Sequence, residues 1–171
     1  MANAPLPFHA ERYELDAWAS GAALSTMGEA DADRLGPELA AIDPWKRYGF
    51  RPDWFGPFLK GQGDGALRFR LSASGELAGS VVIRPQWLAG PYLATFAVLP
   101  PFQRQGLGRA VMAWMESEGR NARARNLWLC VSAFNSAGIG LYAACGFSRV
   151  ALLDDLVKDG EDEVFMRKRL G

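Results

Sequence analysis

Two glycines and two arginines lie close together just past the middle of the chain, in the segment QRQGLGR (residues 103–109). An apolar run with helical spacing follows directly, and the start of a helix presents N–H groups without partners and a partial positive charge. Because Gly106 and Gly108 carry no side chain, a phosphate can approach those N–H groups, and Arg104 and Arg109 add counter-charge. The segment is therefore interpreted as a cradle for a pyrophosphate.

A simpler interpretation of this segment stays open at this point. In a tight turn between a strand and a helix, the glycines would serve the backbone angles and the arginines would only be solvated. Two known phosphate motifs do not fit, because no Gly-Lys-Ser/Thr follows and the third glycine of a dinucleotide fingerprint is missing. A second segment is needed to choose between cradle and turn.

That second segment is SAFNSAGIGLYAACGF (residues 132–147), which predicts a short helix over residues 135–145. Asn135 and Tyr142 are seven residues apart, so they share one face of this helix about 10 Å apart along its axis. Asn135 also suits a helix N-cap, and Tyr142 suits a buried aromatic. Spacing alone assigns neither residue a chemical role.

Taken together, the two segments resemble the GCN5-related N-acetyltransferase (GNAT) superfamily. The loop matches the family pattern Gln/Arg-x-x-Gly-x-Gly/Ala at Gln103, Gly106 and Gly108. The helix matches its second pattern at Asn135, Gly138, Leu141, Tyr142, Gly146 and Phe147. The resemblance covers residues 92–170, whereas the N-terminal half agrees only in the order of its elements.

The resemblance implies acetyl-CoA as the cofactor, bound in a V-shaped gap where the fourth and fifth strands of the sheet splay apart. The pantetheine arm would pair with backbone groups of Phe96, Ala97 and Val98 like an additional strand. The loop that begins at Gln103 would hold the pyrophosphate through the N–H groups of Arg104, Gln105, Gly106, Leu107, Gly108 and Arg109.

The resemblance also implies a reaction without an acyl-enzyme. Asn135 would hydrogen-bond the pantetheine arm, and Tyr142 would protonate the departing thiolate as general acid. The acceptor amine would attack the thioester directly.

The group that deprotonates this amine is not evident. The loop is closest to that of the ribosomal-protein N-terminal acetyltransferases, which carry a glutamate five residues before the motif's asparagine, and Cys130 stands there in this chain. A thiol buried in a strand is a poor base. Ordered water, a carboxylate such as Glu29 or Asp43, and solvent stay open as the base, and the difference argues against a peptide N-terminus as substrate.

The expected acceptor is instead a small aromatic or aliphatic amine or an amino-acid derivative, because aromatic side chains crowd the segments on the acceptor side. They are Trp45, Tyr48, Phe50, Trp54, Phe55, Trp87 and Tyr92. If several of them face a cleft, the pocket is apolar with few charges. A catalytically silent acyl-CoA-binding or regulatory module and an acyltransferase for a longer acyl-CoA remain alternatives.

Hydrophobic periodicity predicts an α/β fold with a mixed sheet. Strands are expected at residues 66–73, 77–83, 92–98, 127–133, 148–153 and 163–170, with an acidic turn between the last two. Helices are expected over residues 26–42, from residue 107 onward and over 135–145, with at most one short helix in the aromatic loop near residues 46–61. Strand 92–98 is apolar enough to be buried on both faces. The GNAT resemblance specifies a twisted, mostly antiparallel sheet of about seven strands with helices on both faces.

The expected organisation is one domain. Residues 1–20 are interpreted as a leader with room for a short strand, and residues 21–171 as a single N-acetyltransferase domain. Within it, residues 21–91 would form the acceptor side and residues 92–171 the acetyl-CoA side. Dimers are common in the superfamily, so a homodimer stays open.

Composition excludes several classes of protein. The 171 residues carry 19 basic and 19 acidic side chains, so no net field favours nucleic acid or an anionic membrane. No apolar run is long enough to span a bilayer, and the N-terminus lacks the features of a secretory signal. Two cysteines and one histidine make neither a disulfide scaffold nor a metal cluster, so no metal is expected. The expected location is a reducing cytoplasm.

Overall fold

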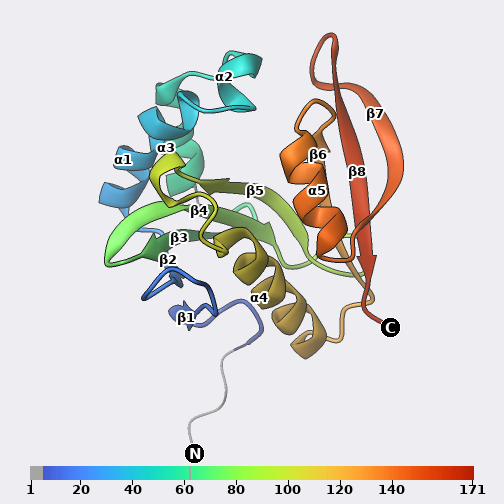
Figure 1. Cartoon of the computed structure of the whole chain (residues 1–171), viewed down its shortest axis with the longest axis horizontal. Coiled ribbons are helices and arrows are strands. Elements are labelled where there is room, and N and C mark those ends of the chain that lie inside the picture. The colour runs from blue at the N-terminus through green and yellow to red at the C-terminus, as the bar shows by residue number, and fades with distance from the viewer. Residues whose placement is uncertain (1–5, 62) are drawn as a thin grey trace, which may run out of the picture.

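The computed structural model describes residues 6–61 and 63–171, which form one eight-stranded sheet with helices on both faces (Figure 1). The order across the sheet is β1-β2-β3-β4-β5-β6-β8-β7. Every pair of neighbours is antiparallel except β5 and β6, which run parallel. The strands are β1 (Arg12–Glu14), β2 (Ala23–Thr26), β3 (Leu67–Ala73), β4 (Glu76–Arg84), β5 (Tyr92–Val98), β6 (Asn126–Ser132), β7 (Ser148–Lys158) and β8 (Glu161–Arg169).

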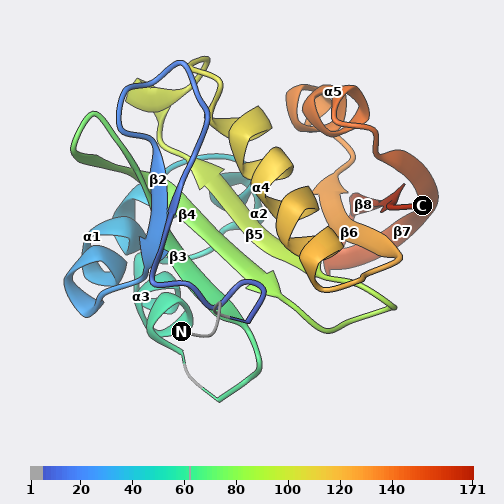
Figure 2. The ribbon, with the colours of Figure 1, turned by 90° about the horizontal axis from the view of Figure 1, so that it is seen from below.

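Five α-helices and one 3-10 turn complete the described part of the chain. They are α1 (Glu29–Ala40), α2 (Trp45–Tyr48), α3 (Pro52–Lys60), the turn Pro100–Phe102, α4 (Leu107–Asn121) and α5 (Ser136–Ala144). Helices α1 and α3 pack against one face of the sheet, and α4 and α5 lie against the other (Figure 2). Among the described residues, no helix is long and apolar enough to cross a membrane.

Helix α4 shows how the sequence pattern becomes packing. Leu107, Val111 and Met115 recur at four-residue spacing, and all three are buried in the apolar cluster that α4 forms with the sheet. Leu35 and Leu39 of α1 are likewise buried, in a separate cluster on the opposite face. The two clusters keep the sheet covered on both sides.

Between β5 and β6 the sheet opens. Only two residue pairs join them, Tyr92 with Trp128 and Leu93 with Leu129. Beyond Leu93 the two halves of the sheet diverge, with β6, β8 and β7 on one side and β5 on the other (Figure 1). Because β5 borders this gap, only Leu93 and Ala97 in it are buried. The expectation that this strand is buried on both faces is therefore wrong.

The mixed α/β fold with a mostly antiparallel sheet is confirmed, and three local predictions are corrected. Strand β2 was not predicted, because its four residues are too few for a clear two-residue period. The aromatic segment forms two helices, α2 and α3, rather than at most one. The acidic residues expected in a turn instead extend β7 to Lys158, because pairing with β8 supports a long hairpin.

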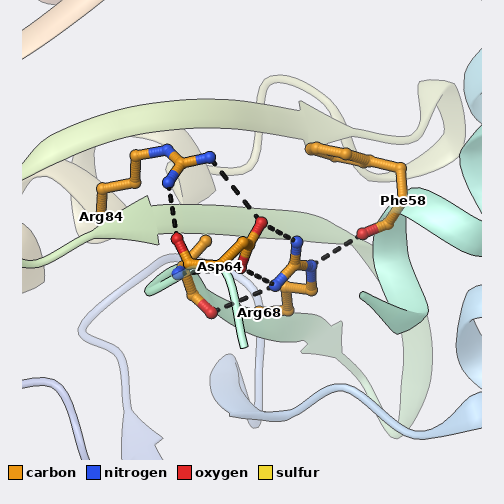
Figure 3. Close-up of polar contacts among 5 residues, drawn as sticks. Phe58, Asp64, Arg68 and Arg84 are labelled. Carbon is orange, nitrogen blue, oxygen red and sulfur yellow. Dashed lines mark hydrogen bonds and ion pairs between the residues drawn. The ribbon is translucent and has the colours of Figure 1, made fainter. Parts of the chain in front are cut away.

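A polar cluster around Asp64 fastens the loop after α3 to the sheet (Figure 3). The buried Arg68 forms an ion pair with the Asp64 carboxylate at 2.7 Å and donates from Nε to the Phe58 carbonyl at 2.7 Å. Arg84 of β4 donates to the Asp64 carbonyl at 2.8 Å. The Arg68 guanidinium holds the pKa of the Asp64 carboxyl well below its usual range. The cluster therefore fixes the end of α3, a helix that covers the acceptor side.

Candidate active site

Two adjoining cavities lie at the gap between β5 and β6. The larger, of about 770 Å³, extends between β5, the start of α4 and α5. All residues predicted to contact the cofactor or its thiolate line it except Gln105. They are Phe96, Ala97, Val98, Gln103, Arg104, Gly106, Leu107, Gly108, Arg109, Asn135 and Tyr142. The tertiary structure thus brings the two sequence segments to one place.

The start of α4 has the backbone conformation that a phosphate cradle needs. Gly106 is the N-cap residue and adopts a left-handed conformation, with φ of 81°. In the described part of the chain, no protein group accepts from the N–H groups of residues 105–109. Those N–H groups and the arginines Arg104 and Arg109 line or flank the same cavity. This corner is suited to bind a multiply charged anion.

Gly106 also lies against Trp18, a residue of the segment predicted to be a leader. A Cβ atom at Gly106 would lie 3.3 Å from the backbone nitrogen of Trp18. The Ala19 N–H donates to the Gln105 carbonyl at 3.3 Å, which holds this part of the leader on the loop. Trp18 lines the larger cavity with 83% of its surface exposed. No pattern in the sequence links it to the loop.

The backbone of β5 is only partly available to a ligand in the gap. The Leu99 N–H donates to the Ala78 carbonyl at 2.8 Å, so Leu99, and Ala97 by the two-residue period, direct their backbone groups toward β4. Phe96 and Val98 therefore direct theirs toward the gap. Gln103 donates from Nε2 to the Val98 carbonyl at 2.9 Å, which ties the cofactor loop to the end of β5.

Helix α5 places Asn135 and Tyr142 at the junction of the two cavities. Asn135 caps the helix, since its Oδ1 accepts from the Gly138 N–H at 2.9 Å. Tyr142 is the buried residue of this helix, with its ring against Phe147. Burial raises the pKa of the Tyr142 hydroxyl, and Cys145 adds to this rise. The hydroxyl therefore holds its proton at neutral pH, as a proton donor must.

The smaller cavity, of about 290 Å³, lies on the acceptor side of the gap. It shares Pro44, Trp45, Phe96, Asn135 and Tyr142 with the larger one, so the two meet at these side chains. Of the aromatic residues predicted to line a cleft, Trp45, Tyr48, Phe50, Trp54 and Tyr92 do so. Phe55 is instead buried in the core beside α1, and Trp87 packs on Tyr92, Trp128 and Phe165.

A carboxylate stands in the wall of the smaller cavity. Glu163 of β8 is 5% exposed and lies directly opposite Ser132 of β6. Its Oε1 accepts a hydrogen bond from the Tyr48 hydroxyl, whose oxygen in turn accepts from Ser132 Oγ at 2.6 Å. Burial and the hydrogen bond to Glu163 raise the pKa of Tyr48.

The carboxylates considered from sequence lie elsewhere. Glu29 is exposed at the start of α1, and Asp43 is exposed at the rim of the larger cavity. Cys130 lines the smaller cavity, but burial and the charge of Glu163 raise the pKa of its thiol despite a hydrogen bond with Tyr92. Sequence reasoning missed Glu163, because only the pairing of β6 with β8 shows that it faces the gap.

Comparison with known proteins agrees with this geometry. The sequence profile of the Acetyltransferase (GNAT) family matches residues 33–147. The chain belongs to the GNAT family. It is 36% identical over 95 residues to the [Ribosomal protein bS18]-alanine N-acetyltransferase of Escherichia coli K12, a match that covers 56% of this chain. The same match spans 64% of the relative's length.

Solved GNAT structures share the fold. The ribosomal-protein-S18-alanine N-acetyltransferase from Escherichia coli superposes with a TM-score of 0.68 at 26% identity, over 88% of this chain and 94% of that one. RimJ from Mycobacterium smegmatis, solved in complex with CoA-disulfide, gives a TM-score of 0.71 at 16% identity, over 92% and 86% of the two chains. The splayed sheet is thus the GNAT fold.

Proposed function

We propose that this GNAT protein is an acetyl-CoA-dependent N-acetyltransferase. The observation that carries the proposal is that the two cavities meet at Tyr142. The larger cavity contains the phosphate cradle at the start of α4, and the smaller cavity lies on the acceptor side. A cofactor in the larger cavity would present its thioester at that junction. The family uses acetyl-CoA, and the uncapped N–H groups of residues 105–109 fit its diphosphate.

Most of the predicted residues have a definite role in this proposal, but Ala97 directs its backbone groups toward β4 and is not among them. The N–H groups from Arg104 to Arg109 bind the pyrophosphate. The backbone groups of Phe96 and the N–H of Val98 pair with the pantetheine amides, whereas the Val98 carbonyl already accepts from Gln103. Asn135 donates from its amide to the pantetheine arm while its Oδ1 caps α5. Tyr142 donates its proton to the thiolate that leaves when the amine attacks.

The acceptor that the smaller cavity favours is a small primary amine with an aromatic or aliphatic body. Its volume of about 290 Å³ is at the lower end of small-molecule sites, and eight of its 19 lining residues are aromatic. Helix α2 and the β7–β8 hairpin both line this cavity and are also joined to each other. Arg47 pairs with Glu161 at 2.7 Å, and Lys158 donates to the Arg47 carbonyl at 2.8 Å.

A second candidate acceptor is the N-terminal alanine of a protein. The curated Escherichia coli relative, 36% identical in the matched region, is named for that activity on bS18. The location proposed for the reaction is the cytoplasm, as expected from the sequence. Cys130 and Cys145 are both free, which fits a compartment where thiols stay reduced.

The test measures CoA release from acetyl-CoA over a panel of acceptors. The panel contains 2-phenylethylamine, hexylamine, an amino-acid amide and a tetrapeptide that begins with alanine. Highest kcat/KM for one of the small amines supports the proposal, and a clear preference for the tetrapeptide favours the second candidate. No turnover with any acceptor while CoA still binds would contradict both and identify a silent CoA-binding module. Propionyl- and hexanoyl-CoA in the same assay test for a longer acyl group.

A further inference from the structure

The Glu163 carboxylate has an unusual environment for a buried charge. It is 5% exposed, and among the described residues no lysine, arginine or histidine nitrogen lies within 4.0 Å of it. Carboxylates buried to this degree are normally paired with a cation. Within residues 6–61 and 63–171, Glu163 accepts one hydrogen bond, at Oε1, and Oε2 is not among the buried polar atoms that lack a partner. Its second oxygen therefore opens onto the smaller cavity, which Glu163 lines.

The neighbours of Glu163 hold its carboxylate in place at the cavity wall. Tyr48 of α2 donates to Oε1 of Glu163, and the Tyr48 hydroxyl is also hydrogen-bonded with Ser132 Oγ of β6. Cys130 and Tyr92 are the other titratable groups that feel its charge, and neither is a cation. The Arg47–Glu161 pair lies farther out, at the end of the hairpin. A cationic group entering the cavity would thus meet one unpaired negative charge.

We infer that Glu163 binds the acceptor's ammonium group and takes its proton, acting as the general base of the transfer. The inference rests on the proposed acetyltransferase function and supplies the base that the Cys130 position lacks. Glu163 lies on β8, the strand that pairs with the strand of Cys130, β6. Its partner in the pairing is Ser132, and Ser132 and Cys130 lie on the same face of β6. The base is thus provided by the neighbouring strand rather than by β6 itself.

Protons and bonds balance in this scheme. The ammonium loses one proton to Glu163, from which it passes to solvent, and the free amine attacks the acetyl carbonyl carbon. The C–N bond forms, the C–S bond breaks, and Tyr142 protonates the thiolate. The nitrogen of the attacking amine then loses a second proton, which reprotonates the Tyr142 phenolate. The products are the N-acetyl amine, CoA-SH and one proton released to solvent.

The test uses Glu163→Gln with the most active amine of the panel. Removing a general base typically costs about 10²–10⁴-fold in rate. We expect kcat/KM to fall at least about 10²-fold, the acid limb of its pH profile to disappear, and the affinity for CoA to stay unchanged. Asp162→Asn is the matched control, because its side chain is on the opposite face of β8 and does not line the cavity. It should retain wild-type turnover.

Two results would overturn the inference while leaving the proposed function intact: wild-type kcat/KM in folded Glu163→Gln, or loss of rate with an unchanged acid limb. Absence of transfer by the wild type itself would overturn both. If Glu163→Gln does not fold, Tyr48→Phe replaces it. Loss of the Tyr48 hydrogen bond disfavours the ionised carboxylate, so the acid limb should move to higher pH. An unmoved limb would then contradict the inference.

Discussion

The hydroxyl of Tyr48 and the carboxylate of Glu163 share a hydrogen bond although 115 residues separate them in the sequence. The contact joins α2, on the acceptor side, to β8, on the far side of the gap in the sheet. Tyr142 reaches the same cavity from α5, on the opposite face. A proton acceptor and a proton donor thus lie on two sides of one opening.

Tyr142→Phe is expected to lower kcat by about 10²-fold, because it removes a proton donor without changing the packing of the ring on Phe147. Affinity for CoA should not change. Stopped assays of CoA release and calorimetric titration with CoA give the two quantities. Tyr13→Phe is the control and should leave both unchanged, because the Tyr13 hydroxyl donates to Glu118 in the last turn of α4 and neither residue lines a cavity. Wild-type kcat in Tyr142→Phe would remove this residue from the mechanism.

Gly106→Val is expected to weaken CoA binding at least about tenfold, a loss of about 1.4 kcal/mol. The new side chain must adopt a φ near 81° and would press on Trp18 at the N–H groups of the cradle. Gly75→Val tests the effect of strain alone, since its φ is 80° and nothing lies within 4 Å of a Cβ there. The control should lose stability but keep CoA affinity. Equal affinity in both variants would argue against the cradle.

Asn135 has two roles that two substitutions separate. Asn135→Ala removes the cap of α5 and should cost about 1 kcal/mol of unfolding free energy as well as CoA affinity. Asn135→Asp keeps an acceptor for the Gly138 N–H and suits the helix start, so it should retain stability. It loses the amide donor and adds negative charge near the cofactor, so CoA affinity should still fall. Unaltered CoA binding in Asn135→Asp would limit this residue to capping.

Asp64→Asn is expected to destabilise the fold by about 2 kcal/mol, because it leaves the buried Arg68 guanidinium without its charged partner. The figure allows for the Asp64 side chain being 39% exposed, which screens the pair. Chemical denaturation at pH 7 gives the change. Asp53→Asn, in an exposed pair with Arg51, should leave the denaturation midpoint nearly unchanged.

The same pair predicts a dependence on pH. The folded-state pKa of Asp64 is lowered, so its contribution is fully present above the unfolded pKa of about 3.9 and is lost as pH falls through the folded value. The stability difference between wild type and Asp64→Asn should therefore shrink below about pH 4. A difference that stays constant from pH 7 to pH 3 would show that the ion pair does not stabilise the fold.

Local patterns determined much of this protein from sequence alone. The glycines and the apolar stripe of α4 specify a strand, a bare loop and a helix, because positive φ and four-residue spacing are properties of neighbouring residues. The seven-residue spacing of Asn135 and Tyr142 places them on one face of α5 for the same reason. These local features were enough to predict the fold family and to name the candidate cofactor residues.

Only the tertiary structure decided which groups from distant segments meet at the reaction site. Glu163 faces the gap because β8 pairs with β6 in one register, and a shift of one residue would turn it to the other face. Phe55 is buried while its neighbour Trp54 reaches the cavity, and Trp18 lies on the cradle from a segment with no clear pattern. Strand register and the packing of short helices depend on contacts between residues far apart in the chain, which composition and local spacing do not encode.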